Sequence, residues 1–217
     1  MRIFYFLVVL CSSLSSFTFA QQPFNHTYDS RKDPRSLNQR MEDYDFQYLC
    51  LNDALKNPHP EKVYELYLYQ CTEEYTSFPR EILKFTNLRI LVIRYPIKWL
   101  PKDINKLKKL EVLIVWGSLV GLPQELGELT NLWWLELPFN NLKKLPSSIS
   151  KLKKLEVLHL GYNPMEEFPV FISQLPKLRY FAWFRNRCDI IPPEYKFFRG
   201  DYLYKGCDPK KSKKTKP

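Results

Sequence analysis

The chain is poor in glycine and histidine, with six glycines and three histidines among 217 residues. Phosphate-binding loops need clustered glycines so that the backbone can approach the phosphates, and neither GxGxxG nor GxxxxGK[ST] occurs. The motifs HExxH of zinc proteases and GxSxG of serine hydrolases are also missing. His26, His59 and His159 stand far apart in the sequence, without the companions of a catalytic set. We therefore expect no enzymatic activity, no catalytic residue, no metal site and no cofactor.

Long apolar runs are missing too. The longest candidate, residues 3–10, is shorter than the ~18 residues that a membrane-spanning helix needs, so we expect no transmembrane segment. Arg2 precedes this run, and Thr18-Phe19-Ala20 follows it with small residues at the −3 and −1 positions of a cleavage site. We interpret residues 1–20 as a cleaved signal peptide and expect a secreted, periplasmic or cell-surface protein. Lipidation at Cys11 is the alternative, disfavoured by the leucine before it.

Both ends of the expected mature chain are polar. Residues 21–41 predict a flexible leader, which includes a glycosylation sequon at Asn25 that matters only in a eukaryotic source. The net charge is +10, and residues 208–217 hold five of the lysines. We expect a solvated, disordered basic tail, with attraction to an anionic surface as the alternative. Nucleic acid is a poor partner for an exported protein, so we expect no nucleic-acid binding.

A repeat of 22 or 23 residues fills the middle of the chain. Its units begin at Phe78, Leu100, Leu122, Leu145 and Phe168, with a degenerate start at Ile191. Each unit combines an apolar-proline pair, apolar residues at every third position and a short alternating segment, as in LPQELGELTNLWWLEL. A period of 20–29 residues with L-x-x-L-x-L-x-x-N/C is the leucine-rich-repeat signature. One unit cannot bury its own apolar row, so the units must stack.

These units resemble the leucine-rich-repeat superfamily, in particular its LPxxIxxLxxLxxLxL subclass. The lead-in DFQYLCLNDALKNPHPEKVYELYL resembles that of exported bacterial members. The resemblance implies an α/β solenoid, a right-handed superhelix with a parallel concave sheet of about six strands and short helical or 3-10 segments on the convex side. It also implies a concave face that binds proteins or peptides. We expect an N-terminal cap helix and linker over residues 42–62, repeats over 63–190 and a C-terminal cap over 191–207. Apolar spacing predicts that the cap helix runs from Glu42 to Leu55, with Phe46, Leu49, Cys50 and Ala54 on its inner side.

The strand pattern predicts where each coil begins and turns. Strand segments are expected to begin at Val63, Leu88, Leu110, Leu132, Leu155 and Leu178. The turn positions that follow them hold Cys71, Pro96, Ser118, Asn140, Asn163 and Asn186. A buried asparagine can bond backbone groups that have left the sheet. We therefore expect an asparagine ladder in the last three coils and looser turns in the second and third.

Apart from Cys11, four cysteines remain, two near each end of the repeats. Such a distribution suits disulfides in the two caps of a solenoid in an oxidising compartment. We predict Cys50–Cys71 and Cys188–Cys207, although the count alone permits three connectivities. Free buried thiols are the alternative. The spacings contain no close pair of the zinc-binding kind.

The outward positions of the strands are rich in aromatic residues. The third, fifth, seventh and eighth positions of the six strand units give 24 residues, of which nine are aromatic and four are charged. Exposed strands favour aromatic residues in any case, but such an area exceeds what a monomer usually exposes. We therefore predict a groove that binds a protein or peptide. A glycan is the nearest competitor, within the alternative of a structural cell-envelope component. The candidate ligand-binding residues are Tyr67, Tyr69, Arg94, Tyr95, Trp116, Trp134, Glu136, Phe139, His159, Tyr162, Tyr180, Phe184 and Arg185.

Within this set, position and residue type single out the energetic anchors. Trp116, Trp134 and Phe139 lie near the centre of the predicted sheet, where neighbours exclude water from a contact. An outward side chain should support little of the core, so we expect Trp134→Ala to lower the free energy of unfolding by less than about 1 kcal/mol. The inward Leu135→Ala should instead destabilise the fold by about 2–5 kcal/mol.

Overall fold

The computed structural model describes residues 47–69, 71–72 and 75–186. The chain divides into two compact units, Met1–Asp43 and Tyr44–Pro217, and all the described residues belong to the second. The expected signal peptide, leader, C-terminal cap and basic tail lie outside the described residues, as does the predicted Cys188–Cys207 disulfide. These expectations stay predictions.

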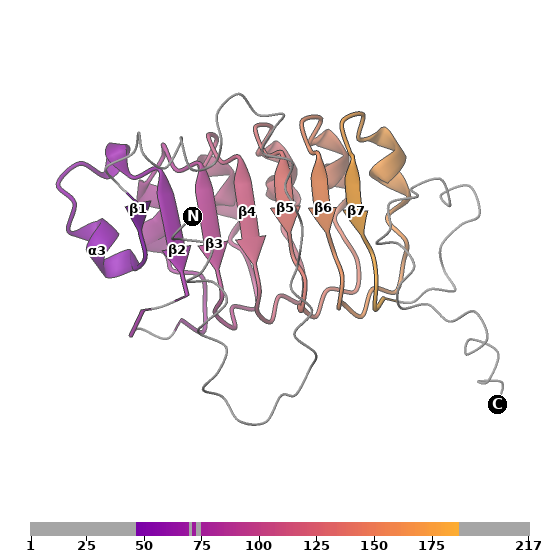
Figure 1. The fold of residues 1–217 in the computed structure, drawn as a ribbon, viewed down its shortest axis with the longest axis horizontal. Coiled ribbons are helices and arrows are strands. Elements are labelled where there is room, and N and C mark those ends of the chain that lie inside the picture. Colours follow the sequence, from indigo (N-terminus) through magenta and orange to yellow (C-terminus); the bar gives the residue numbers. More distant parts are fainter. Residues whose placement is uncertain (1–46, 70, 73–74, 187–217) are drawn as a thin grey trace, which may run out of the picture. The chain divides into compact units, whose positions relative to one another are not determined.

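One parallel sheet runs through the described part of the chain (Figure 1). Its seven strands lie in chain order, each bonded to the next. The strands are β1 (Gln47–Tyr48), β2 (Glu65–Leu68), β3 (Ile90–Ile93), β4 (Val112–Val115), β5 (Trp134–Glu136), β6 (Val157–His159) and β7 (Tyr180–Ala182). Equivalent residues of successive repeats pair directly, as Leu113 does with Leu135 and Leu135 with Leu158. The predicted repeat register is therefore the register of the sheet.

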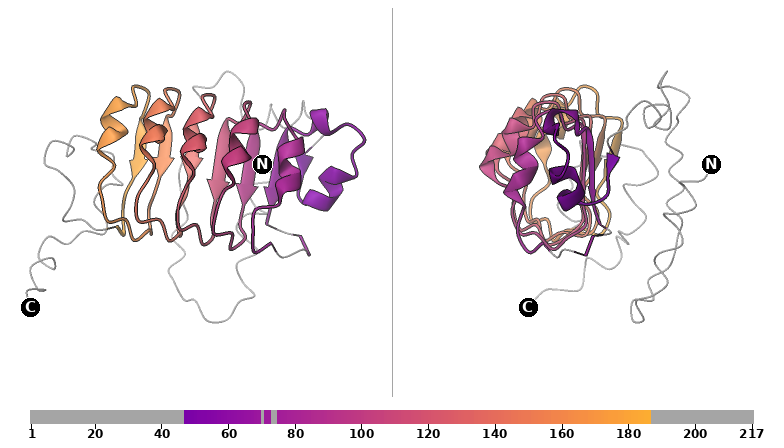
Figure 2. Two further views of the ribbon diagram at one scale, coloured as in Figure 1. Left: turned by 180° about the vertical axis from the view of Figure 1, so that it is seen from behind. Right: turned by 90° about the vertical axis from the view of Figure 1, so that its left-hand side faces the viewer.

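Short 3-10 helices form the layer opposite the sheet (Figure 2). They are η2 (Arg80–Lys84), η3 (Lys102–Lys106), η4 (Gln124–Glu128), η5 (Ser147–Lys151) and η6 (Val170–Gln174), preceded near the chain start by η1 (Pro60–Lys62). A proline stands immediately before each helix from η2 to η6. Its missing N–H falls where a helix start would leave that group without an intrahelical partner. The expectation of short 3-10 segments is confirmed.

The core fills the space between the two layers. In the coil of β5, Leu132, Leu135, Leu137 and Leu142 are fully buried, and Ile149 of the following helix joins them. The inward leucines of neighbouring coils stack on these and form one continuous apolar cluster. The inward positions of the repeat are thus as predicted, and burying each such side chain contributes about 1.5–3 kcal/mol.

The N-terminal cap differs from the expectation. The sequence predicts one helix from Glu42 to Leu55, but Gln47–Tyr48 is a strand that adds β1 to the sheet, and the helix α3 covers only Leu51–Leu55. Leu51 and Ala54 are buried, whereas Leu49, expected on the inner side, is exposed. The open edge of β2 would leave backbone N–H and C=O groups unpaired. A strand such as β1 can pair with those groups, whereas a helix cannot. The predicted disulfide Cys50–Cys71 is confirmed and joins this cap to the first repeat turn.

The asparagine ladder is present in the three coils predicted to have it. The Asn140 side chain accepts a hydrogen bond from the Leu119 backbone N–H at 2.9 Å and donates to the carbonyl oxygens of Val115 at 2.8 Å and Pro138 at 3.1 Å. Asn163 repeats the pattern one coil later. Each asparagine therefore connects two coils through backbone groups that have no strand partner.

Replacing a ladder asparagine should cost much more than replacing its neighbour. Asn140→Ala leaves buried backbone groups unpaired, and we expect it to lower the free energy of unfolding by about 2–3 kcal/mol. The matched control is Asn141→Ala, because Asn141 is exposed and adjacent; it should change stability by less than about 0.5 kcal/mol. Urea melts of both variants measure the difference. Equal losses would show that the ladder bonds do not stabilise the coils.

Candidate functional site

The outward side of the sheet is less open than the sequence suggested. Several residues at outward positions are buried by their neighbours, among them Val92, Val112 and Ala182. His159, a candidate for ligand contact, is only 5% exposed. The most exposed outward residues instead stand just after the strands end, at the seventh and eighth positions of the repeat unit. The candidate site is therefore the row at these strand ends rather than the whole sheet.

Aromatic and arginine side chains form a continuous row along these positions, called here the aromatic row. The Arg94 guanidinium carbon lies 5.2 Å from the Tyr69 ring centre and 4.4 Å from that of Trp116. Trp116 packs on Phe139 at 5.8 Å, and Phe139 stacks on Tyr162 at 4.2 Å, nearly parallel. Tyr162 then meets the Phe184 ring edge-on at 5.2 Å and the Arg185 guanidinium at 5.9 Å. The row consists of Tyr69, Arg94, Trp116, Phe139, Tyr162, Phe184 and Arg185.

Three members of the row adopt a left-handed backbone conformation. Phe139, Tyr162 and Arg185 have φ values of 54°, 57° and 63°, which is uncommon for residues with a side chain. Each stands immediately before a ladder asparagine. The conformation costs of order 1 kcal/mol or more per residue, so the turn must hold it in place. It accompanies the largest outward exposure of the row's rings, 45% for Phe139 and 36% for Tyr162.

Gly161 leaves room for the Phe184 ring of the aromatic row to pack over β6. A Cβ atom at this position would lie 2.9 Å from the Phe184 ring, closer than real contacts allow, and 3.0 Å from the His159 ring nitrogen, a tight contact. The absent side chain leaves room for Phe184 to pack against His159, with ring centres 5.4 Å apart. His159 thus supports Phe184 from below and is poorly placed to touch a ligand itself.

Glu136 links β5 and β6 near the centre of the sheet through polar contacts. Its carboxylate accepts a hydrogen bond from the Trp134 indole N–H at 3.0 Å and lies 3.5 Å from the His159 ring nitrogen Nδ1. Burial raises the pKa of Glu136, but hydrogen bonding and charge from His159, with the indole N–H groups of Trp134 and Trp116, together hold it below the usual 4.5. Because Trp134 supplies one of these bonds and is half-buried, we now expect Trp134→Ala to cost more stability than the sequence suggested.

The other candidates lie beside the row. The Tyr67 hydroxyl donates to Glu65 at 3.0 Å, and Tyr95 packs edge-on against Tyr75 at 5.2 Å. Burial raises the pKa of Glu65, opposed by that hydrogen bond and by the charge of Arg89. Tyr180 is half-buried in β7, away from the row's ring contacts described above.

Sequence reasoning did not single out Trp99, the most exposed large apolar residue in the described part of the chain, at 60%. It lies after the turn of its coil, where its ring covers Gly121 and its backbone pairs with that residue. The sequence does mark Trp99 as unusual, because the equivalent position in the next two repeats holds glycine and lysine.

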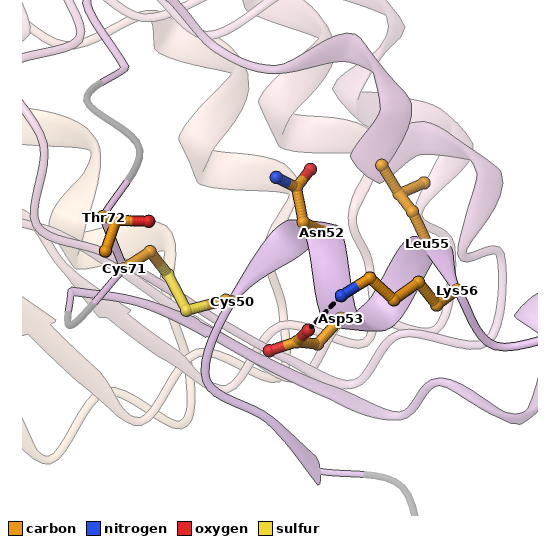
Figure 3. Close-up of a pocket in the computed structure, with 7 residues that line it drawn as sticks. All are labelled: Cys50, Asn52, Asp53, Leu55, Lys56, Cys71 and Thr72. Atoms are coloured by element: carbon orange, nitrogen blue, oxygen red, sulfur yellow. Dashed lines mark hydrogen bonds and ion pairs between the residues drawn. A yellow bond between two sulfur atoms is a disulfide. The ribbon is translucent and has the colours of Figure 1, made fainter.

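A surface pocket lies at the N-terminal cap, next to the Cys50–Cys71 disulfide (Figure 3). Asp53 of α3 and Lys56, the residue after the helix, pair across part of its wall at 3.0 Å. None of the predicted ligand-binding residues lines this pocket.

Over the described ranges, no three His, Cys, Asp or Glu side chains gather closely enough to hold a metal ion, and no helix is long and apolar enough to cross a membrane.

No protein-family model matches the sequence, and no curated protein matches it significantly. Solved structures do resemble it. A leucine-rich-repeat protein of Leptospira interrogans is 34% identical over 58% of this chain and 33% of its own, with a TM-score of 0.53. The leucine-rich-repeat ectodomain of the Arabidopsis thaliana receptor kinase GASSHO1/SCHENGEN3, in complex with CASPARIAN STRIP INTEGRITY FACTOR 2, is 26% identical over 58% of this chain and 16% of its own, with a TM-score of 0.50. A TDR receptor is 28% identical over 58% and 22%, with a TM-score of 0.52.

The chain thus covers a third or less of the length of these structures. The first two are leucine-rich-repeat proteins, and this chain has the parallel strands and short 3-10 helices that its repeat predicts. Its fold is a leucine-rich-repeat solenoid.

The ionised form of Glu136 should contribute to stability. Its pKa is lowered in the folded chain, so its contribution is complete above the unfolded-state pKa near 4.5 and is lost as the pH falls through the folded-state value. We expect Glu136→Gln to lower the free energy of unfolding by about 1–2 kcal/mol at pH 6, and the deficit to shrink below pH ~4. Urea melts at several pH values measure it. The exposed Glu167→Gln is the control, and a Glu136→Gln deficit that stays constant down to pH ~3 would refute the proposed role.

Proposed function

We propose that this protein is a secreted or envelope-associated recognition module that binds a protein or peptide through the aromatic row. The observation that carries the proposal is the row itself. It runs from Tyr69 to Arg185 across six successive strands, and its members contact one another in an unbroken series. Tyrosine, tryptophan and arginine dominate binding hot spots because they bury a large area and keep a polar group for bonding.

The conformational strain in the aromatic row supports a role beyond folding. Phe139 and Tyr162 are large apolar side chains held outward by left-handed backbone, where smaller polar residues would serve a turn better. Strain of this kind clusters at ligand-binding sites. The leucine-rich-repeat ectodomain of the Arabidopsis receptor kinase, solved with a bound factor, supports protein or peptide binding as the class of function.

Two observations support export. The disulfide Cys50–Cys71 is of a kind that persists in oxidising compartments. The first twenty residues also carry the charged, apolar and small-residue regions of a signal peptide. The lead-in that resembles exported bacterial members agrees with this placement, whereas the LPxxI subclass also occurs in intracellular Ras-pathway scaffolds, which the signal peptide disfavours.

The second candidate is a structural cell-envelope component that binds glycan or an anionic surface. The exposed rings of Phe139 and Tyr162 favour it, because aromatic ring faces also suit sugar rings. Salt dependence distinguishes attachment to an anionic surface from binding at the aromatic row. Attachment through the basic tail should weaken steeply as the salt concentration rises, whereas binding to the aromatic row should change little.

Phe139→Ala should weaken binding with little effect on the fold. Phe139 is more exposed than Trp134 and makes no side-chain bond to Glu136, so it tests the surface more cleanly. We expect a loss of about 2 kcal/mol of binding, near thirtyfold in affinity, and less than about 1 kcal/mol of stability. The measurement is titration with a partner captured from the native extracellular medium, alongside urea melts.

The matched control is Val170→Ala, which truncates an exposed apolar side chain on the helical side of the solenoid. It should leave affinity unchanged. If Phe139→Ala binds as tightly as the unmodified chain while Val170→Ala does not, the recognition surface lies on the helical layer.

A further inference from the structure

The exposed charges of the aromatic row are of one sign. Arg94 and Arg185 are exposed, near the two ends of the row. The acidic residues at outward strand positions are Glu65 and Glu136, and neither is exposed: Glu65 is buried, and Glu136 is directed to Trp134 and His159. The row therefore offers a partner aromatic rings between two positive charges.

The two arginines keep their hydrogen-bonding capacity. Rings cover the Arg94 guanidinium on both sides, and Tyr162 lies against that of Arg185. Stacking occupies the faces of a guanidinium, while its five N–H donors lie in the plane and point outward from the edge. In the described part of the chain no carboxylate forms an ion pair with either arginine, in contrast to Arg80 with Asp103 and Arg89 with Glu111.

Such an arrangement suits carboxylates. The Arg94 guanidinium lies between two rings and has little further conformational freedom to lose on binding. The fork of donors of either arginine matches the two oxygens of a carboxylate. The row thus favours an acidic group at each end and apolar groups between them.

The spacing of the arginines sets the spacing of these acidic groups. Arg94 follows β3 and Arg185 follows β7, four strand intervals apart. At ~4.8 Å per interval this separation is ~19 Å, and an extended chain rising ~3.3 Å per residue covers it in about six residues.

We propose that the partner bound by the aromatic row is an extended peptide segment that crosses the strands, with two acidic residues about six positions apart and apolar or aromatic residues between them. One acidic residue bonds Arg94 and the other bonds Arg185, while the intervening side chains pack on Trp116, Phe139 and Tyr162. This inference rests on the proposed function and specifies the partner of the same surface.

An acidic polysaccharide shares the carboxylate chemistry and also has faces that stack on rings. A peptide is favoured by the row's shape. The Tyr162 and Phe184 rings meet edge-on and the Trp116 and Phe139 rings are tilted by 48°, so the row's surface is uneven and suits separate side chains better than a chain of flat sugar rings. Alginate, a polymer of acidic sugars, serves as the probe for the competing partner.

The test is selection from a displayed library of random peptides of about twelve residues against the full chain, which needs no knowledge of the natural partner. We expect the enriched peptides to carry two acidic residues separated by about five to seven positions, with apolar residues between them. Synthetic versions with both acids changed to the amides should bind at least tenfold more weakly. Alginate should not compete at matched carboxylate concentration.

Charge reversal provides the specific readout. Selection against Arg94→Glu should replace one acidic residue of the pattern with lysine or arginine, and Arg185→Glu should do the same at the other end. Lys102→Glu makes the same charge change on the exposed helix η3 and should leave the pattern unchanged. Circular dichroism melts of the three variants separate misfolding from a change in preference.

The outcomes distinguish the two proposals. If peptides are enriched whose binding depends on Phe139 but which lack paired acids, or whose charge pattern ignores the reversals, the acidic-segment proposal is wrong and the recognition function stands. If alginate competes and depends on both arginines, the partner is an acidic glycan and the proposal is overturned. If no enriched peptide depends on Phe139 or Tyr162, both proposals fail.

Discussion

The structure depends on how each coil satisfies the backbone groups that leave the sheet at its turn. In the last three coils a buried asparagine does this, and its amide joins the backbone of its own coil to that of the coil before. The residue before each of these asparagines is left-handed, whereas the equivalent Tyr95 and Gly117 of the coils without asparagine are not. The turn that closes the coil is therefore also the turn that directs Phe139, Tyr162 and Arg185 outward.

The surface and the core are in this way two consequences of one repeat. Stacking in register brings equivalent residues of neighbouring coils together, so leucines at inward positions make the core and aromatic residues at the strand ends make the row. The Arg94 side chain extends the row into the coils that lack the asparagine, because it fits between Tyr69 and Trp116. A change in register would disperse both at once.

Much of this could be predicted from the sequence because a repeat period fixes which residues are equivalent. The strand positions, the inward leucines and the asparagine ladder all followed from that equivalence, whereas the Cys50–Cys71 disulfide followed from the distribution of the cysteines. The period says that a side chain points outward, but not whether its neighbours cover it. His159 is buried because Gly161 leaves space for Phe184, which is a matter of the sizes of particular neighbours.

The cap was harder to predict for a related reason. Residues outside the repeat have no equivalent elsewhere in the chain, so the helix expected from Glu42 to Leu55 rested on apolar spacing alone. The open edge of β2 instead pairs with Gln47–Tyr48, and only Leu51–Leu55 is helical. Pairing at a sheet edge is determined by the unpaired backbone groups of the neighbouring coil. The side chains of the segment that pairs therefore carry little sign of it.

The central claim is that the aromatic row, and not another exposed apolar surface, is where a partner binds. Hydroxyl-radical footprinting tests it directly, because the radicals oxidise exposed aromatic side chains and mass spectrometry reads each one separately. With a bound protein or peptide partner at saturation, oxidation of Trp116, Phe139 and Tyr162 should fall severalfold while that of Trp99, the more exposed ring on another surface, stays the same. Protection of Trp99 with no change along the row would contradict the account.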